Sequence, residues 1–332
     1  MNERLIYLDY IKTIALVLVL LYHCAFSQNF LLSPILSTCV PLFFCVNGFL
    51  MLRKEHTMDE MLLKNIKILF LAVFWSVISI IIVNISIHGK IPTLEEVWRK
   101  TQSPYIPDNA HIWYMYSLAA LNILNPIIGK YLRNINKREA YCLILILCLF
   151  SLQITSIYWP RILNFMTWTN SFCLVYYITG YLLLSKRINL SKIKNSLLIV
   201  LILLFILIQY IHTYLAFNVQ PFTRLIKHDS FIFQGFYTYP IFFLTCAIIE
   251  LFSRITWKKN KFIDFISKNS LGIYLVHWSI FSFLRTINPI FQNGYILVLS
   301  TFIISITCVF LFNTNTYSSY LINMNIKLRK NK

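Results

Sequence analysis

Three histidines in or beside long apolar segments are the residues best suited to proton transfer in this chain. His23 ends one apolar run, His111 precedes a second, and His277 lies inside a third. Imidazole has an unperturbed pKa of about 6.5, so it can take up or release a proton near neutral pH. Ionisable groups in apolar segments are costly and usually mark function. The three histidines therefore indicate acid–base chemistry, such as the deprotonation of a hydroxyl group.

The first apolar segment carries two further ionisable residues, Asp9 and Lys12, at its beginning. In a helix, Lys12 and His23 would share nearly one face and lie roughly 16 Å apart along the axis. Asp9 and Lys12 are three residues apart and could pair. The alternative is that Lys12 only anchors the helix at a membrane surface and His23 is an interfacial histidine with satisfied hydrogen bonds.

Two other segments place polar side chains beside aromatic ones. His111 is followed by Trp113, and Ser270, Tyr274 and His277 follow the spacing i, i+4, i+7. This spacing puts the last three residues on one helix face, which in a membrane helix should point into the bundle. The alternatives are that Trp113 belongs to an interfacial aromatic belt, that His111 caps a helix, and that the polar face of 270–277 only packs against another helix.

The composition indicates the elements that must hold these residues. The chain is 58% hydrophobic and only 13% charged, whereas soluble chains carry about 25% charged residues. Its net charge of +18 is spread in short clusters between apolar runs, which argues against nucleic-acid binding. Seven glycines argue against a glycine-rich nucleotide loop, and the cysteines show no CxxC pair or metal-ligand spacing, so we expect no metal.

We therefore predict an all-α integral membrane protein with about ten transmembrane helices, forming a single transmembrane domain over residues 1–332. The longest polar loop, 88–110, is predicted to hold a short interfacial helix around 94–100. The predicted spans lie near residues 10–26, 34–52, 65–87, 111–130, 139–158, 170–185, 196–216, 233–252, 269–287 and 293–313.

The lysines and arginines predict the orientation. With ten spans, 23 of the 30 fall at the two termini and in the even-numbered loops, and 7 fall on the opposite side. By the positive-inside rule both termini are expected in the cytoplasm. His23 and His111 then lie toward the outer side and His277 near mid-depth, while Asp9, Lys12, Asn47 and Ser270 lie toward the inner side.

The chain resembles the membrane-bound acyltransferase-3 family, which O-acylates surface polysaccharides, lipopolysaccharide and peptidoglycan. It looks most like the enterobacterial common antigen O-acetyltransferase type. Two positions depart from the family pattern: Lys12 stands where the family has arginine, and Asn47 where it usually has serine. The resemblance rests on Leu8–Lys12 with His23, on Val40–Leu50, on His111–Tyr114 and on Ser270–His277.

The resemblance implies a multi-pass enzyme of the bacterial inner membrane, surrounded by membrane lipid. We expect it to move an acyl group, specifically acetyl, from cytoplasmic acyl-CoA (acetyl-CoA) to a hydroxyl of a surface or lipid-linked glycan, with no permanently bound cofactor. Its oligomeric state is left open. The expected roles are catalytic for His23, His111 and Asp9, donor binding for Lys12, Asn47 and Ser270, and cavity lining for Trp113, Tyr274 and His277.

Two other functions remain open at this point. A transporter or flippase for a lipid-linked glycan would also need ten spans and buried polar groups, but it would favour inverted repeats, which we do not find. A structural membrane protein would not need buried ionisable residues. No GxSxG motif is present, so direct or histidine-mediated transfer is preferred to a serine acyl-enzyme.

Overall fold

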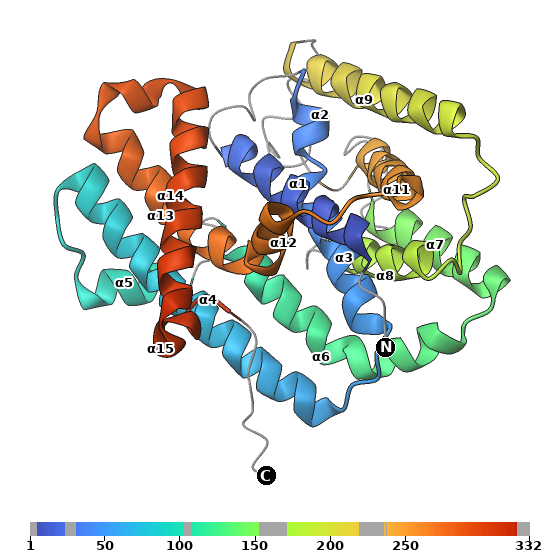
Figure 1. Cartoon of the computed structure of the whole chain (residues 1–332), viewed down its shortest axis with the longest axis horizontal. Coiled ribbons are helices and arrows are strands. Elements are labelled where there is room, and N and C mark those ends of the chain that lie inside the picture. Colours follow the sequence, from blue (N-terminus) through green and yellow to red (C-terminus); the bar gives the residue numbers. More distant parts are fainter. Residues whose placement is uncertain are drawn as a thin grey trace. The chain divides into compact units, whose positions relative to one another are not determined.

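The computed structural model describes residues 5–23, 31–102, 108–109, 111–152, 171–218, 236 and 238–323. These residues form helices joined by short connections, as the prediction of an all-α protein requires (Figure 1). They divide into two compact units, each built from two separate stretches of the chain. Unit 1 comprises Met1–Glu55 and Asn125–Lys259, and unit 2 comprises His56–Leu124 and Asn260–Lys332.

Unit 1 contains the N-terminal helices and the middle of the chain. Within it, α3 packs against α1 and α8, α8 packs against α7, and α11 packs against α9, α8 and α1. Its helices are α1 (Ile6–His23), α2 (Ser33–Leu36), α3 (Cys39–Leu52), α7 (Lys137–Ser151), α8 (Ser171–Leu184), α9 (Asn195–Asn218) and α11 (Tyr239–Arg254).

Unit 2 is organised around α13, which packs against α4, α12 and α14. Its helices are α4 (Met58–His88), α5 (Leu94–Thr101), α12 (Lys261–Lys268), α13 (Ser270–Ile287), α14 (Gly294–Thr314) and α15 (Thr316–Ser319), with a 3-10 turn η4 (Pro289–Gln292). The division between the units falls inside α6 (Trp113–Asn134), next to Pro126. Proline has no N–H and so removes one helical hydrogen bond at this point, but α6 continues through it.

Each of the ten predicted spans overlaps one helix, or the pair α2 and α3, and residues 24–26, 153–158, 170, 233–235 and 237 of these spans lie outside the described residues. Five segments are long and apolar enough to cross a membrane: Ile6–His23, Ser33–Leu52, Met58–His88, Asn195–Leu215 and Gly294–Thr314. Phe172–Leu184 is a shorter apolar helix. The apolar helices support a multi-pass membrane protein, while the count of ten, the single domain and the orientation stay predictions. The predicted interfacial helix is present as α5.

Local sequence signals explain where several helices begin. Thr57 precedes α4 and Thr93 precedes α5, and in both cases a glutamate three residues later completes a capping box. Asn136 and Glu139 do the same at the start of α7. These boxes satisfy main-chain N–H groups that the first turn of a helix leaves without a partner.

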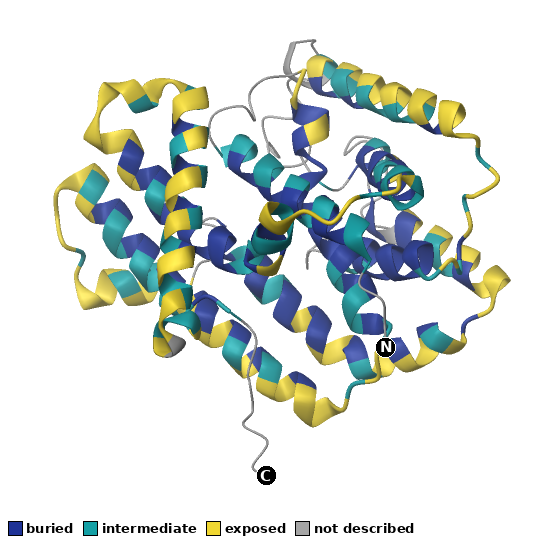
Figure 2. Ribbon diagram, viewed as in Figure 1, coloured by how far each residue is buried: buried dark blue, intermediate teal, exposed yellow. Residues whose placement is uncertain are grey.

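Helices α3 and α8 approach each other at two glycines. A methyl group on Gly48 would overlap the main-chain carbonyl of Tyr177, and one on Gly180 would overlap that of Cys45. Small residues allow membrane helices to pack this closely, because dispersion forces between backbones then drive their association. In Figure 2 most of α3 is coloured as buried, whereas α9 is exposed along one side. The exposed residues of α9 include large apolar ones such as Leu203 and Leu207.

Candidate active site

In unit 1, the predicted residues Asp9, Lys12 and His23 all lie on α1. Asp9 is buried, whereas Lys12 and His23 are half-buried. The continuous helix from Ile6 to His23 places His23 roughly 16 Å from Lys12 along the axis. Asn47 lies on α3, which packs against α1. Unit 1 thus contains two of the predicted donor-binding residues, Lys12 and Asn47, and two of the predicted catalytic residues, Asp9 and His23.

The first turns of α1 are fastened to the connection that follows α11. The Tyr10 hydroxyl donates to the main-chain oxygen of Lys258 at 3.0 Å. The Tyr10 ring lies 4.2 Å from that of Trp257, which stacks in turn on Phe252 at 5.0 Å. The exposed cations Lys258 and Lys259 are therefore held beside the end of α1 that carries the predicted donor-binding residue.

In unit 2, His111 and His277 come together in a buried aromatic cluster. Their ring centroids are 5.4 Å apart in an edge-to-face arrangement, and each side chain is at most 1% exposed. The Trp278 ring stacks on His111 at 5.7 Å, and Tyr274 lies 5.7 Å from His111 and 5.5 Å from His277. Burial of Tyr274 and His277 agrees with the expectation that this face of the helix points away from lipid.

Hydrogen bonds determine which ring nitrogen of His277 carries the proton. The Tyr274 hydroxyl donates to the main-chain oxygen of His111. Nδ1 of His277 pairs with the main-chain oxygen of Tyr274. A carbonyl oxygen can only accept, so Nδ1 carries the proton, and a neutral His277 keeps its lone pair on Nε2. The cluster therefore offers an oriented imidazole beside a second imidazole, an arrangement suited to moving a proton.

The segment leading to His111 is bonded to the side of α4, a contact that the sequence does not predict. Asn84 contacts Asp108, and Ser76 contacts Asn109. These two residues of α4 precede its last residue, His88, by four and twelve positions, which corresponds to roughly 6 and 18 Å along the helix. The rings of His111 and His277 lie in contact, which the sequence does not predict, while the depth of either histidine in the membrane stays a prediction.

The other predicted residues occupy helix starts. Trp113 is the first residue of α6 and Ser270 the first of α13, and both are half-buried. The structure thus brings His111, Tyr274 and His277 together in unit 2, while Asp9, Lys12, His23 and Asn47 belong to unit 1. A single chamber shared by all of these side chains stays a prediction.

Several residues around His111 were not predicted from the sequence to belong to the site. Trp278 directly follows His277, and its position next to a histidine in an apolar run was the available signal. Asp108 and Asn109 directly precede the histidine motif, but their partners Lys100, Asn84 and Ser76 are 8 to 33 residues away. One sequence gives no means of pairing residues at such distances.

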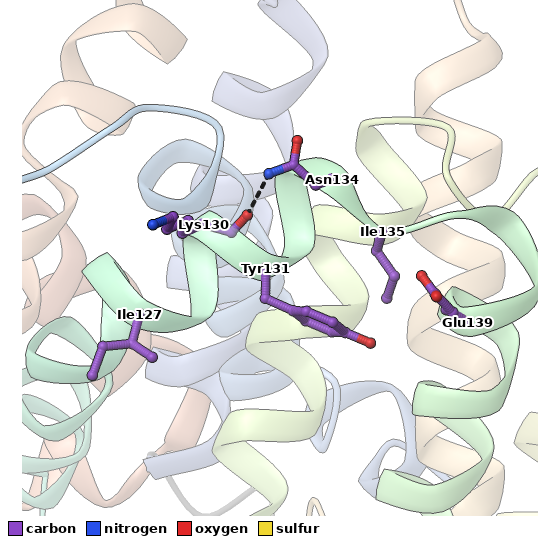
Figure 3. A pocket seen from close by; sticks show the side chains of 6 residues that line it. All are labelled: Ile127, Lys130, Tyr131, Asn134, Ile135 and Glu139. Carbon is purple, nitrogen blue, oxygen red and sulfur yellow. Dashed lines mark hydrogen bonds between the residues drawn. The ribbon is translucent and has the colours of Figure 1, made fainter.

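A cavity of about 500 Å³ in unit 1 lies between the end of α6 and the start of α7, and the predicted site residues do not line it. Figure 3 shows the Tyr131 ring extending from α6 toward the helix that carries Glu139. The polar groups there already serve the helix ends, because Asn134 donates to the Lys130 carbonyl at 3.0 Å and Glu139 accepts from the Asn136 main chain at 3.0 Å. We therefore interpret this cavity as a groove at a helix connection.

Comparison with known proteins identifies the family. A sequence model of the acyltransferase-3 family, described as an acyltransferase domain, matches residues 5–314. No curated protein and no solved structure matches the chain significantly. The match favours the acyltransferase over the transporter and the structural alternatives. Since it covers nearly the whole chain, from α1 through α14, this protein belongs to the acyltransferase-3 family and is an acyltransferase.

Proposed function

We propose that the protein is an O-acetyltransferase of the bacterial inner membrane, of the type that modifies enterobacterial common antigen. It moves an acetyl group from cytoplasmic acetyl-CoA to a hydroxyl of a surface or lipid-linked glycan. The observation that carries this proposal is the buried pair His111 and His277, whose rings are 5.4 Å apart inside an acyltransferase domain. A buried imidazole can accept the proton of a hydroxyl group, and a second imidazole beside it can pass that proton on.

The reaction converts the thioester of the donor into an oxygen ester on the glycan. The glycan hydroxyl oxygen attacks the thioester carbon, the C–O bond forms as the C–S bond breaks, and coenzyme A leaves as a thiol. The hydroxyl proton passes to a histidine and then to the leaving sulfur. His23 is proposed as the general base, with His111 as a second catalytic histidine. Asp9 lies roughly 21 Å from His23 along α1 and is proposed to act with Lys12 at the donor end. His277 and Tyr274 line the path of the proton in unit 2, and the attack leaves an oxyanion that polar groups must stabilise.

The donor is proposed to bind at the inner end of α1. Coenzyme A carries phosphates, and cations near a binding site attract them. Lys12 supplies one cation, and the Tyr10–Trp257 contact keeps Lys258 and Lys259 near the same end of the helix. Lysine binds phosphate as a point charge, without the planar fork of the arginine usual in the family. Asn47 and Ser270 are proposed to contact the remainder of the donor.

Mass analysis of surface glycans tests the proposal directly. Cells with the protein should carry glycans heavier by one ester-linked acetyl group per modified residue, and mild alkali should remove the difference. Purified protein in vesicles should transfer label from acetyl-CoA to lipid-linked glycan. Glycans without a new ester in both assays would refute the O-acetyltransferase assignment. A different acyl mass would refute only the choice of acetyl.

A further inference from the structure

The main chain that leads to His111 is held by a partly buried ion pair in unit 2. Lys100, in the last turn of α5, has its ammonium nitrogen 2.5 Å from Oδ2 of Asp108. The side chains of Lys100 and Asp108 are only 21% and 14% exposed. Ion pairs at this degree of burial are screened less by water than surface pairs, and the charge-assisted hydrogen bond restricts the positions of both side chains.

A third side chain closes the arrangement. Asn84 of α4 accepts from the Lys100 ammonium at 3.1 Å through Oδ1 and donates to Oδ2 of Asp108 at 3.3 Å through Nδ2. The same Nδ2 donates to the Ile80 carbonyl at 2.8 Å. Each pair among Lys100, Asp108 and Asn84 is therefore bonded directly. We call these three residues the clasp.

Asn109, which follows Asp108, is also held by hydrogen bonds. Asn109 is fully buried, and its amide donates to the Ser76 hydroxyl at 2.5 Å and to the Lys100 carbonyl at 3.4 Å. Two residues later, the His111 carbonyl accepts from Tyr274. Residues 108, 109 and 111 are thus bonded to α4, α5 and α13.

We propose that Lys100, Asp108 and Asn84 are positioning residues for acyl transfer, which hold the His111 imidazole against His277. The proposal rests on the proposed function of the histidine pair. Lys100 lies on α5 and Asp108 between α5 and α6, so neither belongs to the contacts of α13 with α4, α12 and α14 that build unit 2. Loss of the clasp should therefore loosen the segment 108–112 without unfolding the unit. A displacement of about 1 Å at a catalytic group can reduce turnover by roughly 100-fold.

The experiment compares four variants in the vesicle assay with acetyl-CoA. Asp108→Asn and Lys100→Met should each reduce kcat about 10- to 100-fold, with little change in the KM for acetyl-CoA. Lys100→Arg, which keeps a cation for both Asp108 and Asn84, should restore most of the turnover. Arg99→Met is the matched control, because Arg99 is an exposed cation of the same helix, and it should behave like the unmodified protein.

Hydrogen–deuterium exchange gives a readout that does not depend on activity. Peptides covering residues 108–116 should exchange faster in Asp108→Asn and Lys100→Met, and peptides from α14 should not change. Normal turnover and normal exchange in both variants would overturn the proposal, as would an equal loss of turnover in Arg99→Met. Faster exchange with normal turnover would overturn the catalytic role of the clasp. If His111→Ala retained full transfer, the proposed role of the histidine pair would fail instead.

Discussion

Replacing Gly48 by alanine should destabilise unit 1, because the added methyl group has no space. It would fall on the Tyr177 carbonyl, which belongs to the backbone of α8 and cannot rotate away. Helices α3 and α8 would have to separate along their whole contact. Overpacking of this kind costs about 1–3 kcal/mol, equivalent to roughly a 5- to 150-fold loss in the ratio of folded to unfolded protein. Gly180→Ala should have a similar effect from the opposite helix.

Unfolding in increasing SDS, followed by fluorescence, measures this free energy in detergent. Gly129→Ala is the control, since its methyl group would lie 2.9 Å from the Arg133 guanidinium, the flexible end of a side chain. We expect its cost to stay below about 1 kcal/mol, the ordinary size for a mutation. Because Asn47 adjoins Gly48, acyl transfer should fall in parallel with stability in Gly48→Ala. If Gly48→Ala, Gly180→Ala and Gly129→Ala all had the same free energy of unfolding, the close approach of α3 and α8 would be refuted.

Three further predictions concern catalysis, donor binding and topology. His23→Ala should lower glycan acylation by about 10²–10⁴-fold, the usual contribution of a general base, at unchanged membrane abundance on immunoblots; near-normal acylation would contradict its role. Lys12→Ala should raise the KM for acetyl-CoA far more than that for the glycan, while Lys12→Arg should be tolerated; equal changes for both substrates would indicate a structural role. Reporter fusions after Lys137 and Lys259 should report cytoplasm and a fusion at Asp108 the outside; a cytoplasmic signal at Asp108 would contradict ten spans.

The helices could be predicted because their signals are local. Apolar runs of sufficient length mark the spans, and the capping box of Thr93 and Glu96 marks the start of α5. The shared face of Tyr274 and His277 follows from helical spacing alone, and both side chains are buried. These features depend on residues close together in the chain, so a single sequence contains them.

The arrangement of the helices could not be predicted in this way. Each unit combines stretches separated by more than sixty residues. The apolar residues of a helix do not indicate which other helix it packs against. The contacts of residues 108–109 with α4 depend on hydrogen bonds to Asn84 and Ser76, whereas hydropathy indicates only a loop at this place. The tight approach at Gly48 depends on a second glycine 132 positions away in the chain, at Gly180.

The division of unit 2 into two stretches has a consequence for biosynthesis. Tyr274, whose hydroxyl holds the His111 carbonyl, follows that residue by 163 positions. At about 5–20 residues per second, the ribosome adds it roughly 8–33 s later. During this interval α4 is already made, but the hydroxyl of Ser79 lacks its later partner Ser279 on α13. The nascent protein must therefore keep these polar groups away from lipid until Asn260–Lys332, about the last fifth of the chain, has been made, a task suited to the insertion machinery.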